Sequence, residues 1–584
     1  MQEFLKITDP KLERKMVSYD FSITDWKTLE QYYQQLLEEK PDSVQELEEF
    51  LLKINEVDAI VAEELAWRYI RMTCNTQKES NKQDYQFFLT EILPHVSVIK
   101  DTINRKIADN PWFESLDPVF YQTFTRSLKR EITLFREENV QLEAKAASIS
   151  QQHTEIMGSM TIQYEGREMT VPEAGIYLEK PDRKVRQEVW ELLRQRREEE
   201  RDKLLNIFSQ LVELRHSIAQ NAGYDSYTAY KFDQMARFDY TLADTRSFHE
   251  AVEKVVTPIY CELMEERKER MGLSELRPWD LSVDIFADTP LVPFSDSEDL
   301  IKKSIEALSR LRPELGKMIA IMHEHHYLDL DTRPGKAPGG YNYPLMETGI
   351  PFIFMNAANS HKYVITMLHE SGHAIHSFLT RNIPLDVLKQ TPSEVAELAS
   401  MTMELLCLDN YDIFYPDPEA VAIAQKSQLY RCIDVFPWIA TIDAFQQWVY
   451  DHPTSDDDAR NKRFEELYLR FHGDSVNWEG YEEVRQHLWL KQSHIFDVPF
   501  YYIEYAIAQL GALAIWRNYK LNPEQGLTQY LDALKLGYSK PIPEIYKTAG
   551  IAFDFSEDYM RTCMEFCLEE YKKIQTGTVN SLEG

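Results

Sequence analysis

Two histidines and a glutamate in the segment 363–380 have the types and the spacing of a metal-binding site. The segment reads YVITMLHESGHAIHSFLT and contains three histidines, one acidic residue and no Lys, Arg or Asp. On an α-helix, His369 and His373 fall within about 40° of each other, with Cβ atoms roughly 5–6 Å apart. Two imidazoles at this spacing can hold one cation. Glu370 lies about 100° round the helix, where its carboxylate suits a general base better than a third ligand.

The remainder of this expected helix is apolar. Val364, Leu368, Ile375 and Phe378 leave no broad charged face, so the helix is expected to be buried. Burying unpaired imidazoles and a carboxylate is costly unless a cation compensates for the lost solvation. A chance H-E-x-x-H match, with histidines that only fill the core, is the alternative interpretation. The desolvation cost favours the metal site.

A third ligand is expected from a second helix further along the chain. The segment TPSEVAELASMTMELL predicts a helix that Thr391 caps, with Glu394 closing a capping box. Glu397 and Glu404 would then share the inward face of this helix. One of the two is expected to bind the metal and the other to support the site. For Glu404 alone, an ordinary buried and hydrogen-bonded carboxylate is an equal alternative.

The elements that must position these residues are mainly helices. The segment 182–223 has apolar residues at spacings of three and four, which predicts one long helix or two stacked ones. Strand signals are few: MTIQYEGREMTV predicts a short hairpin around Glu165–Gly166, and PFIFMN at Pro351–Asn356 precedes the histidine helix. The expected fold class is mainly α, with a small β-sheet beside the H-E-x-x-H helix.

The 584 residues are too many for a single core, so two or more lobes are expected. Residues 1–199 are predicted to form an N-terminal helical lobe, with the hairpin near 160–171. Residues 200–575 are predicted to form the catalytic domain and residues 576–584 a frayed tail.

Charge and composition exclude several kinds of partner. The chain has 64 Lys and Arg against 96 Asp and Glu, a net charge of -32, which argues against binding nucleic acids or anionic membranes. The N-terminal residues resemble no secretory signal, and no apolar run is long enough to span a membrane. The six cysteines form no CxxC pair and are expected to be reduced thiols. A cytoplasmic protein, monomeric or weakly self-associating, is therefore expected.

HESGHAIHSF followed by VAELASMTMEL resembles the thimet-oligopeptidase and oligoendopeptidase F group of zinc metallopeptidases. The resemblance implies one zinc ion per chain, bound by His369, His373 and Glu397, with Glu370 as the base. It implies that His376 is a polar lining residue rather than a ligand. It also implies a zincin-like core in a large helical shell, around a deep channel that admits short unfolded peptides.

Two stretches ahead of the histidine helix extend the resemblance. RPGKAPGGYNYP is similar to the family's glycine-rich loop, and PFIFMNAANS is similar to its cleft-edge strand, whose backbone would pair with an extended peptide. On their own, the glycines indicate only a flexible or tight backbone. The substrate-binding residues implied here are Gly339, Gly340, Tyr341, Phe354 and Asn356.

A third stretch, SHIFDVPFYYIEYAIAQLGALAIW, resembles the family's histidine and tyrosine cluster over the substrate. It implies catalytic roles for His494, Tyr502 and Tyr505 as oxyanion donors, and a substrate-binding role for Tyr501. The choice between Tyr501 and Tyr502 stays open. Without the resemblance, an aromatic run of this kind is more often core packing.

The expected function is that of a zinc-dependent oligoendopeptidase, which hydrolyses internal bonds of short unfolded peptides with water activated by zinc and Glu370. One alternative is an exopeptidase of the same fold that releases dipeptides and recognises a chain terminus by a fixed charge. The other is a non-catalytic peptide-binding relative. The presence of Glu370 argues against the latter, because metal binding does not require that base.

Overall fold

The chain forms two compact units, and the computed structural model describes residues 14–287, 291–337 and 339–576. Each unit is assembled from three separate stretches of chain: up to Thr133, Val292–Pro416 and Ala514–Phe553 in the first, and Leu134–Leu291, Asp417–Leu513 and the chain from Asp554 in the second. The linear boundary expected between residues 199 and 200 instead falls between two helices of the second unit. Of the expected tail, residues 577–584 lie outside the described part.

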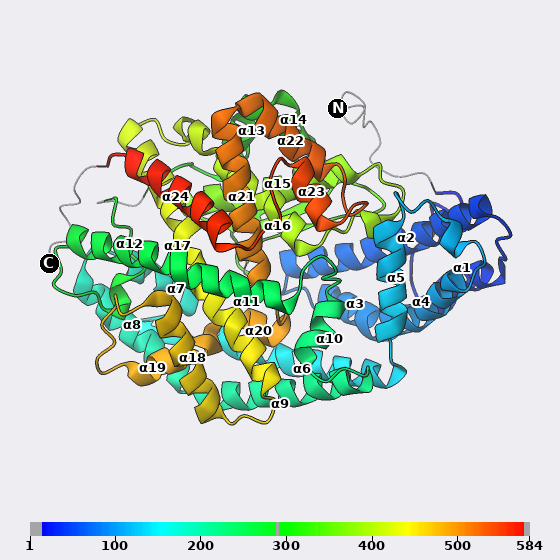
Figure 1. Cartoon of the computed structure of the whole chain (residues 1–584), viewed down its shortest axis with the longest axis horizontal. Coiled ribbons are helices and arrows are strands. Elements are labelled where there is room, and N and C mark those ends of the chain that lie inside the picture. Colours follow the sequence, from blue (N-terminus) through cyan, green and yellow to red (C-terminus); the bar gives the residue numbers. More distant parts are fainter. Residues whose placement is uncertain (1–13, 288–290, 338, 577–584) are drawn as a thin grey trace. The chain divides into compact units, whose positions relative to one another are not determined.

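Helices dominate both units, so the mainly α class is confirmed (Figure 1). The first unit contains α1 (Trp26–Glu38), α2 (Val44–Cys74), α3 (Glu79–Phe87), α4 (Leu93–Ala108), α5 (Gln122–Leu134), α13 (Ser297–Leu311), α14 (Pro313–Glu324), β3 (Leu328–Asp331), β4 (Tyr341–Tyr343), β5 (Phe352–Ala357), α15 (His361–Thr380), α16 (Ser393–Leu406), α22 (Pro523–Leu534) and α23 (Ile542–Thr548).

The second unit contains α6 (Glu137–Ser159), β1 (Thr161–Tyr164), β2 (Arg167–Thr170), α7 (Val171–Gly175), α8 (Arg183–Glu198), α9 (Arg201–Asn221), α10 (Tyr227–Gln234), α11 (Leu242–Ala251), α12 (Thr257–Arg270), α17 (Pro418–Asp451), α18 (Asp457–His472), α19 (Glu482–Gln486), α20 (Ser493–Asp497) and α24 (Glu557–Lys573). Helix α21 (Ile503–Leu521) contributes residues to both units. Of the two alternatives for residues 182–223, the structure has two helices, α8 and α9.

Several helices begin at the residues that their capping chemistry favours. The Asp25 side chain accepts a hydrogen bond from the Thr28 N–H at the start of α1, and Ser43 accepts one from the Glu46 N–H at the start of α2. These side chains satisfy backbone donors that have no partner within the helix.

The hairpin expected around Glu165–Gly166 is present. β1 and β2 pair antiparallel from Thr161 opposite Thr170 to Tyr164 opposite Arg167. Both turn residues have positive φ, 51° at Glu165 and 75° at Gly166, as a tight two-residue hairpin turn requires.

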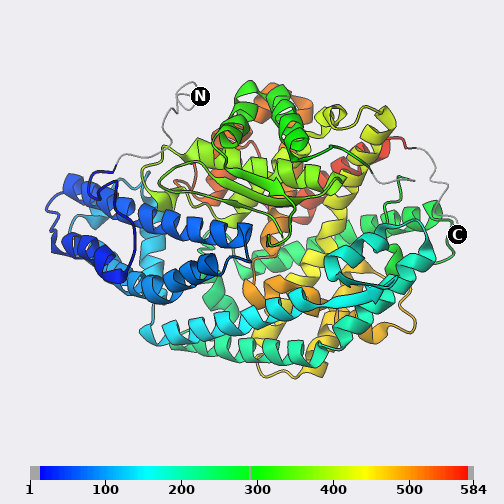
Figure 2. The same ribbon diagram turned by 180° about the vertical axis from the view of Figure 1, so that it is seen from behind.

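The small sheet of the first unit has the strand order β3-β5-β4 (Figure 2). β3 pairs parallel with the central strand β5, and β4 pairs antiparallel with it. The first four residues of β5 are buried, as expected for a central strand covered on both faces. Helix α15 packs against β4 and β5, which confirms the expected sheet beside the H-E-x-x-H helix.

In the described part of the chain, no helix combines the length and the apolar character needed to cross a membrane.

Candidate active site

Helix α15 carries the histidine motif and is buried along most of its surface. Its apolar residues pack inward on all sides, and Glu370 is buried with them. The side chains of His369 and His373 remain 21% and 19% exposed. The helix therefore opens toward solvent mainly along its histidine stripe, as the sequence predicts.

Gly372 lets α16 approach α15 very closely. A Cβ atom at this position would lie 2.6 Å from both the Ala399 carbonyl oxygen and the Ser400 Cα, inside the contact distance of real atoms. Both neighbours are backbone atoms of a buried helix, so neither can move aside without moving α16. This approach places Glu397 opposite the two histidines.

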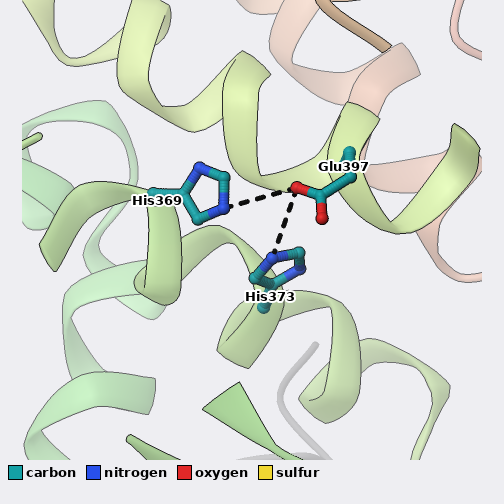
Figure 3. A group of neighbouring side chains, drawn as sticks. All are labelled: His369, His373 and Glu397. Carbon is teal, nitrogen blue, oxygen red and sulfur yellow. Dashed lines mark ion pairs between the residues drawn. The ribbon is translucent and has the colours of Figure 1, made fainter. Parts of the chain in front are cut away.

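The three expected ligands come together at this contact (Figure 3). One carboxylate oxygen of Glu397, Oε2, lies 3.3 Å from His369 Nε2 and 3.7 Å from His373 Nε2. The two imidazole rings stand nearly perpendicular, at 83°, with centroids 4.9 Å apart. All three donor atoms therefore face one point, as a single cation requires.

Two further side chains orient the ligands. Glu404 Oε1 lies 2.7 Å from His369 Nδ1, so this ring donates its Nδ1–H to Glu404 and directs its Nε2 atom toward Glu397. Ser400 donates to Glu397 Oε2 at 3.0 Å. Of the two candidate glutamates, Glu397 thus sits at the ligand position and Glu404 supports His369.

The charges of this group are strongly coupled. Burial alone would lower the pKa of His369, but its hydrogen bonds with Glu397 and Glu404 raise that pKa well above the ordinary value. Burial lowers the pKa of His373 to about 4. Burial would raise the pKa of Glu397, but the hydrogen bond from His369 and the charges of both histidines lower it to about 2. Glu397 is therefore ionised at neutral pH, as a metal ligand must be.

Glu370 has a different environment. Its Oε2 atom is buried and has no hydrogen-bond partner among the described residues, and burial raises its pKa to about 7. The Asn342 side chain on β4 donates to the Glu370 backbone carbonyl at 3.3 Å, which ties this turn of α15 to the sheet. A carboxylate with a pKa near neutrality is suited to accept and return a proton.

The residues present fit one divalent cation. Two imidazole nitrogens and one ionised carboxylate are the donor set of catalytic zinc sites that keep a position open for substrate or water. A cation bound here would displace the additional proton of His369. Glu370, the neighbour of His369 in the chain, adds a carboxylate whose Oε2 has no partner among the described residues and whose charge interacts with those of His369 and Glu397. His376 is buried and does not belong to this group of possible ligands, and burial together with the charge of His373 lowers its pKa to about 3.

The backbone of α16 is held by tyrosines that the sequence patterns did not indicate. Tyr530 on α22 donates to the Ala399 carbonyl at 2.6 Å, and Tyr546 on α23 donates to the Glu394 carbonyl at 3.0 Å.

The predicted capping box at the start of α16 is wrong. Pro392 stays extended with ψ at 149°, and the helix begins at Ser393 without a capping side chain.

The glycine-rich loop and strand β5 are tightly packed. Gly339 has φ of +96°, and a Cβ at Gly340 would lie 3.3 Å from the Phe354 carbonyl oxygen. Tyr341 stacks on Phe354 at 4.8 Å between ring centroids, and Asn356 donates to the Ala337 and Gly339 carbonyls.

The prediction that β5 is a free edge for a peptide is wrong over Phe352–Phe354. Both of its edges there are taken, by β3 and by β4, so β4 is the outer strand on its side of the sheet. The Phe354 side chain is fully buried, which leaves it no surface for substrate. Sequence alone shows that a strand is apolar and does not show which neighbours flank it.

The second unit assembles the predicted histidine and tyrosine cluster. The His494 ring lies 4.8 Å from that of Tyr502, 5.9 Å from that of Tyr505 and 6.2 Å from that of Tyr501, between centroids. Tyr505 in turn contacts both other tyrosines. Burial raises the pKa of Tyr502 to about 12, so its phenol keeps its proton at neutral pH.

A chain of hydrogen bonds assigns the tautomer of His494. The Trp438 indole N–H, which can only donate, bonds to Gln492 Oε1 at 2.9 Å. Gln492 therefore presents its NH₂ group to His494 Nδ1 at 2.7 Å, and Nδ1 accepts. The proton of a neutral His494 then resides on Nε2, which makes this ring a hydrogen-bond donor on its other side.

Two buried arginines, missed by sequence reasoning, hold the segment that carries the cluster. Arg215 on α9 donates to the Ile495 and Phe496 carbonyls, and Arg237 donates to the Phe500 carbonyl at 2.6 Å and to Glu504 at 2.8 Å. Phe500 adopts a strained φ of 68°, which these contacts stabilise.

The fold and this donor set define a metallopeptidase of the H-E-x-x-H class with a downstream glutamate. Residues 176–565 match the model of peptidase family M3, and residues 16–135 match the peptidase M3 N-terminal domain. The chain therefore belongs to peptidase family M3.

Relatives and solved structures agree with this assignment. An oligoendopeptidase F homolog of Lactococcus lactis subsp. lactis is 25% identical over 333 residues, 54% of this chain and 52% of that protein. An oligoendopeptidase F homolog of Borreliella burgdorferi is 23% identical over 411 residues, 68% of this chain and 67% of that protein. The chain thus spans about half the length of the Lactococcus relative. The structure of Pz peptidase A with inhibitor 2 superimposes with a TM-score of 0.89 at 25% identity, covering 97% of this chain and 100% of that one.

Replacing Gly372 by Ala should loosen the contact that positions Glu397. The added methyl group meets backbone at 2.6 Å, so we expect a loss of about 1–3 kcal/mol in the free energy of unfolding and weaker metal binding. Gly158→Ala in α6 is the matched control, because a Cβ there meets nothing within 4 Å. Chemical unfolding and metal content measured on both variants check this; equal behaviour would contradict the role of the contact.

Replacing Glu404 by Gln should weaken metal binding while leaving the three ligands in place. His369 would then donate its Nδ1–H to a neutral amide oxygen instead of a carboxylate, and weakening a partner of this kind typically costs 10–100-fold in metal affinity. Competition with a chromophoric zinc chelator measures the change. Glu544→Gln, an exposed position on α23, controls for the loss of one negative charge. Unchanged affinity in Glu404→Gln would assign Glu404 a purely structural role.

Proposed function

We propose that the protein is a zinc-dependent oligoendopeptidase that cuts internal bonds of short, unfolded peptides. The observation that carries the proposal is the juxtaposition of Glu397 Oε2 with the Nε2 atoms of His369 and His373, next to the buried and unpartnered Oε2 of Glu370. Metal binding alone would require only the three ligands. A fourth, proton-accepting group beside them is a requirement of hydrolysis.

One zinc ion held by His369, His373 and Glu397 would polarise the scissile carbonyl and make water more acidic. Glu370 takes the proton from the attacking water and delivers it to the nitrogen of the leaving amine. Its pKa of about 7 suits both transfers, because neither protonation state is strongly favoured at neutral pH.

The histidine and tyrosine cluster would stabilise the oxyanion that forms when water adds to the carbonyl. His494 contributes its Nε2–H, and the phenols of Tyr502 and Tyr505 contribute O–H donors. Each such donor is worth about 2.7–4 kcal/mol in the transition state. Tyr501, whose ring lies further from His494 than that of Tyr502, contacts the peptide instead.

Internal cleavage is supported by the relatives, which are named oligoendopeptidases. The test is mass-spectrometric mapping of products from peptides of graded length, for the native protein and for Glu370→Gln, with the metal content of both. Internal cuts in short peptides only, lost in the variant that still holds one zinc ion, are expected. The variant keeps the shape of the side chain and all three ligands, so only proton transfer is removed.

Other outcomes lead to different functions. Release of terminal dipeptides would replace the proposal by the exopeptidase alternative. A native protein that holds one zinc ion and cuts no peptide in a diverse set would be a binding protein.

The three tyrosines can be separated by single replacements with Phe, which remove one hydroxyl each. Tyr502→Phe and Tyr505→Phe should lower kcat about 10²–10³-fold with little change in KM, because the donors act on the transition state. Tyr501→Phe should mainly raise KM. Steady-state kinetics on one fluorogenic peptide distinguish these patterns, and a kcat loss confined to Tyr501→Phe would exchange the two roles.

A further inference from the structure

A pocket in the second unit lies between α8, α9 and the segment that joins α19 to α20. Its cavity volume is about 100 Å³, which has room for a small charged group but is below the volume of a typical site for a drug-sized ligand. Apolar side chains form one part of its wall, among them Trp190 on α8 and Leu204 on α9. Nothing in the peptidase mechanism uses this pocket.

The charge of the lining is opposite to that of the chain. Four cationic side chains, Arg194, Arg197, Arg201 and Lys491, line the pocket, against one carboxylate, that of Glu198. The whole chain carries 96 acidic and 64 basic residues. A surplus of positive charge in one hollow of so acidic a protein indicates a site for a negatively charged group.

Two of the four cations already have partners. Arg194 donates to Glu191 at 2.9 Å, and Arg201 bonds to Glu198 and to Glu483, the latter at 3.0 Å. Arg197 and Lys491 differ, since neither side chain makes a hydrogen bond or an ion pair with another described residue. The Nε atom of Arg197 is buried without an acceptor, and Lys491 has only the Trp438 ring, 4.8 Å from its ammonium.

The charges of Arg197 and Lys491 also repel each other. Surrounding protein atoms and the charge of Arg197 lower the pKa of Lys491 to about 8, although part of the Lys491 side chain reaches solvent. Burial lowers the pKa of Arg197 as well. An anion between the two groups would offset the repulsion between their charges.

A metal ion is the rival occupant, since Glu198, Glu483 and His487 bring possible ligand atoms within 4.8 Å of one another at the edge of this pocket. The guanidinium of Arg201 bonds to both of these carboxylates. A cation of the protein itself therefore neutralises them already. This leaves an anion as the occupant that the unpaired groups favour.

We propose that the pocket binds a small organic oxyanion, a carboxylate or a phosphate, whose oxygens bond to Arg197 and Lys491 and whose apolar part packs against Trp190 and Leu204. A planar guanidinium recognises either group through paired N–H donors. The adjoining apolar wall selects a molecule with a hydrophobic body over a bare inorganic ion.

Isothermal titration calorimetry of the native protein with phenyl phosphate and with benzoate, at fixed ionic strength, tests this. At least one probe should bind saturably at one site, and neutral benzyl alcohol should not. Arg197→Gln and Lys491→Gln should each weaken binding about tenfold or more, because each loses a charge-assisted bond. Arg196→Gln is the matched control: it lies on the same helix, pairs with Glu199 and Glu200, and does not line the pocket.

A zinc-free variant, His373→Ala, separates this pocket from the metal centre. Binding that persists in His373→Ala and falls in Lys491→Gln, an exposed change that should not disturb folding, supports the proposal. It is overturned if neither probe binds, if Arg197→Gln and Lys491→Gln bind as well as Arg196→Gln, or if His373→Ala abolishes binding. None of these results depends on peptidase activity.

Discussion

The candidate metal site depends on how closely α15 and α16 approach each other at Gly372. With a hydrogen atom in place of a side chain, the Ala399 carbonyl and the Ser400 Cα can lie where a methyl group would otherwise be. Glu397 is carried on the same turn of α16, so the backbone contact sets its distance from both imidazoles. A ligand positioned by two packed helices is held more precisely than one on a loop.

The second constraint is the cost of burying charged groups. Two glutamates of the site, Glu397 and Glu370, are both buried but have different surroundings and therefore different pKa values. Glu397 faces two histidines and a serine hydroxyl, and its pKa falls to about 2. Glu370 has no such partner for its Oε2 among the described residues, and burial raises its pKa to about 7. One carboxylate is thereby kept ionised, as the proposed metal ligand requires, and the other has the pKa that the proposed proton transfer requires. Paired acid groups with separated pKa values are a general feature of hydrolytic sites.

Local patterns in the sequence predicted much of this centre, because helical spacing alone places His369, Glu370 and His373, and the next amphipathic helix supplies Glu397 and Glu404. The parts that could not be predicted depend on distant partners. Tyr530 and Tyr546 contact α16 from more than 130 residues away, and Arg215 reaches a carbonyl 280 residues along the chain. The central place of β5 depends on strand pairing, which an apolar run does not encode. The start of α16 was misplaced because Pro392 favours an extended backbone as readily as a first helical turn.

The scattered composition of the first unit has a consequence for biosynthesis. Helix α16 leaves the ribosome long before Tyr530 is made, since 131 residues separate that phenol from the Ala399 carbonyl to which it donates. The intervening Asp417–Leu513 belongs to the other unit. A growing chain must therefore carry its metal-binding helices unfinished while almost a hundred residues of a different unit are added. A polypeptide that ends between Glu397 and Ala514 contains the full metal motif but lacks the last stretch of the first unit, Ala514–Phe553.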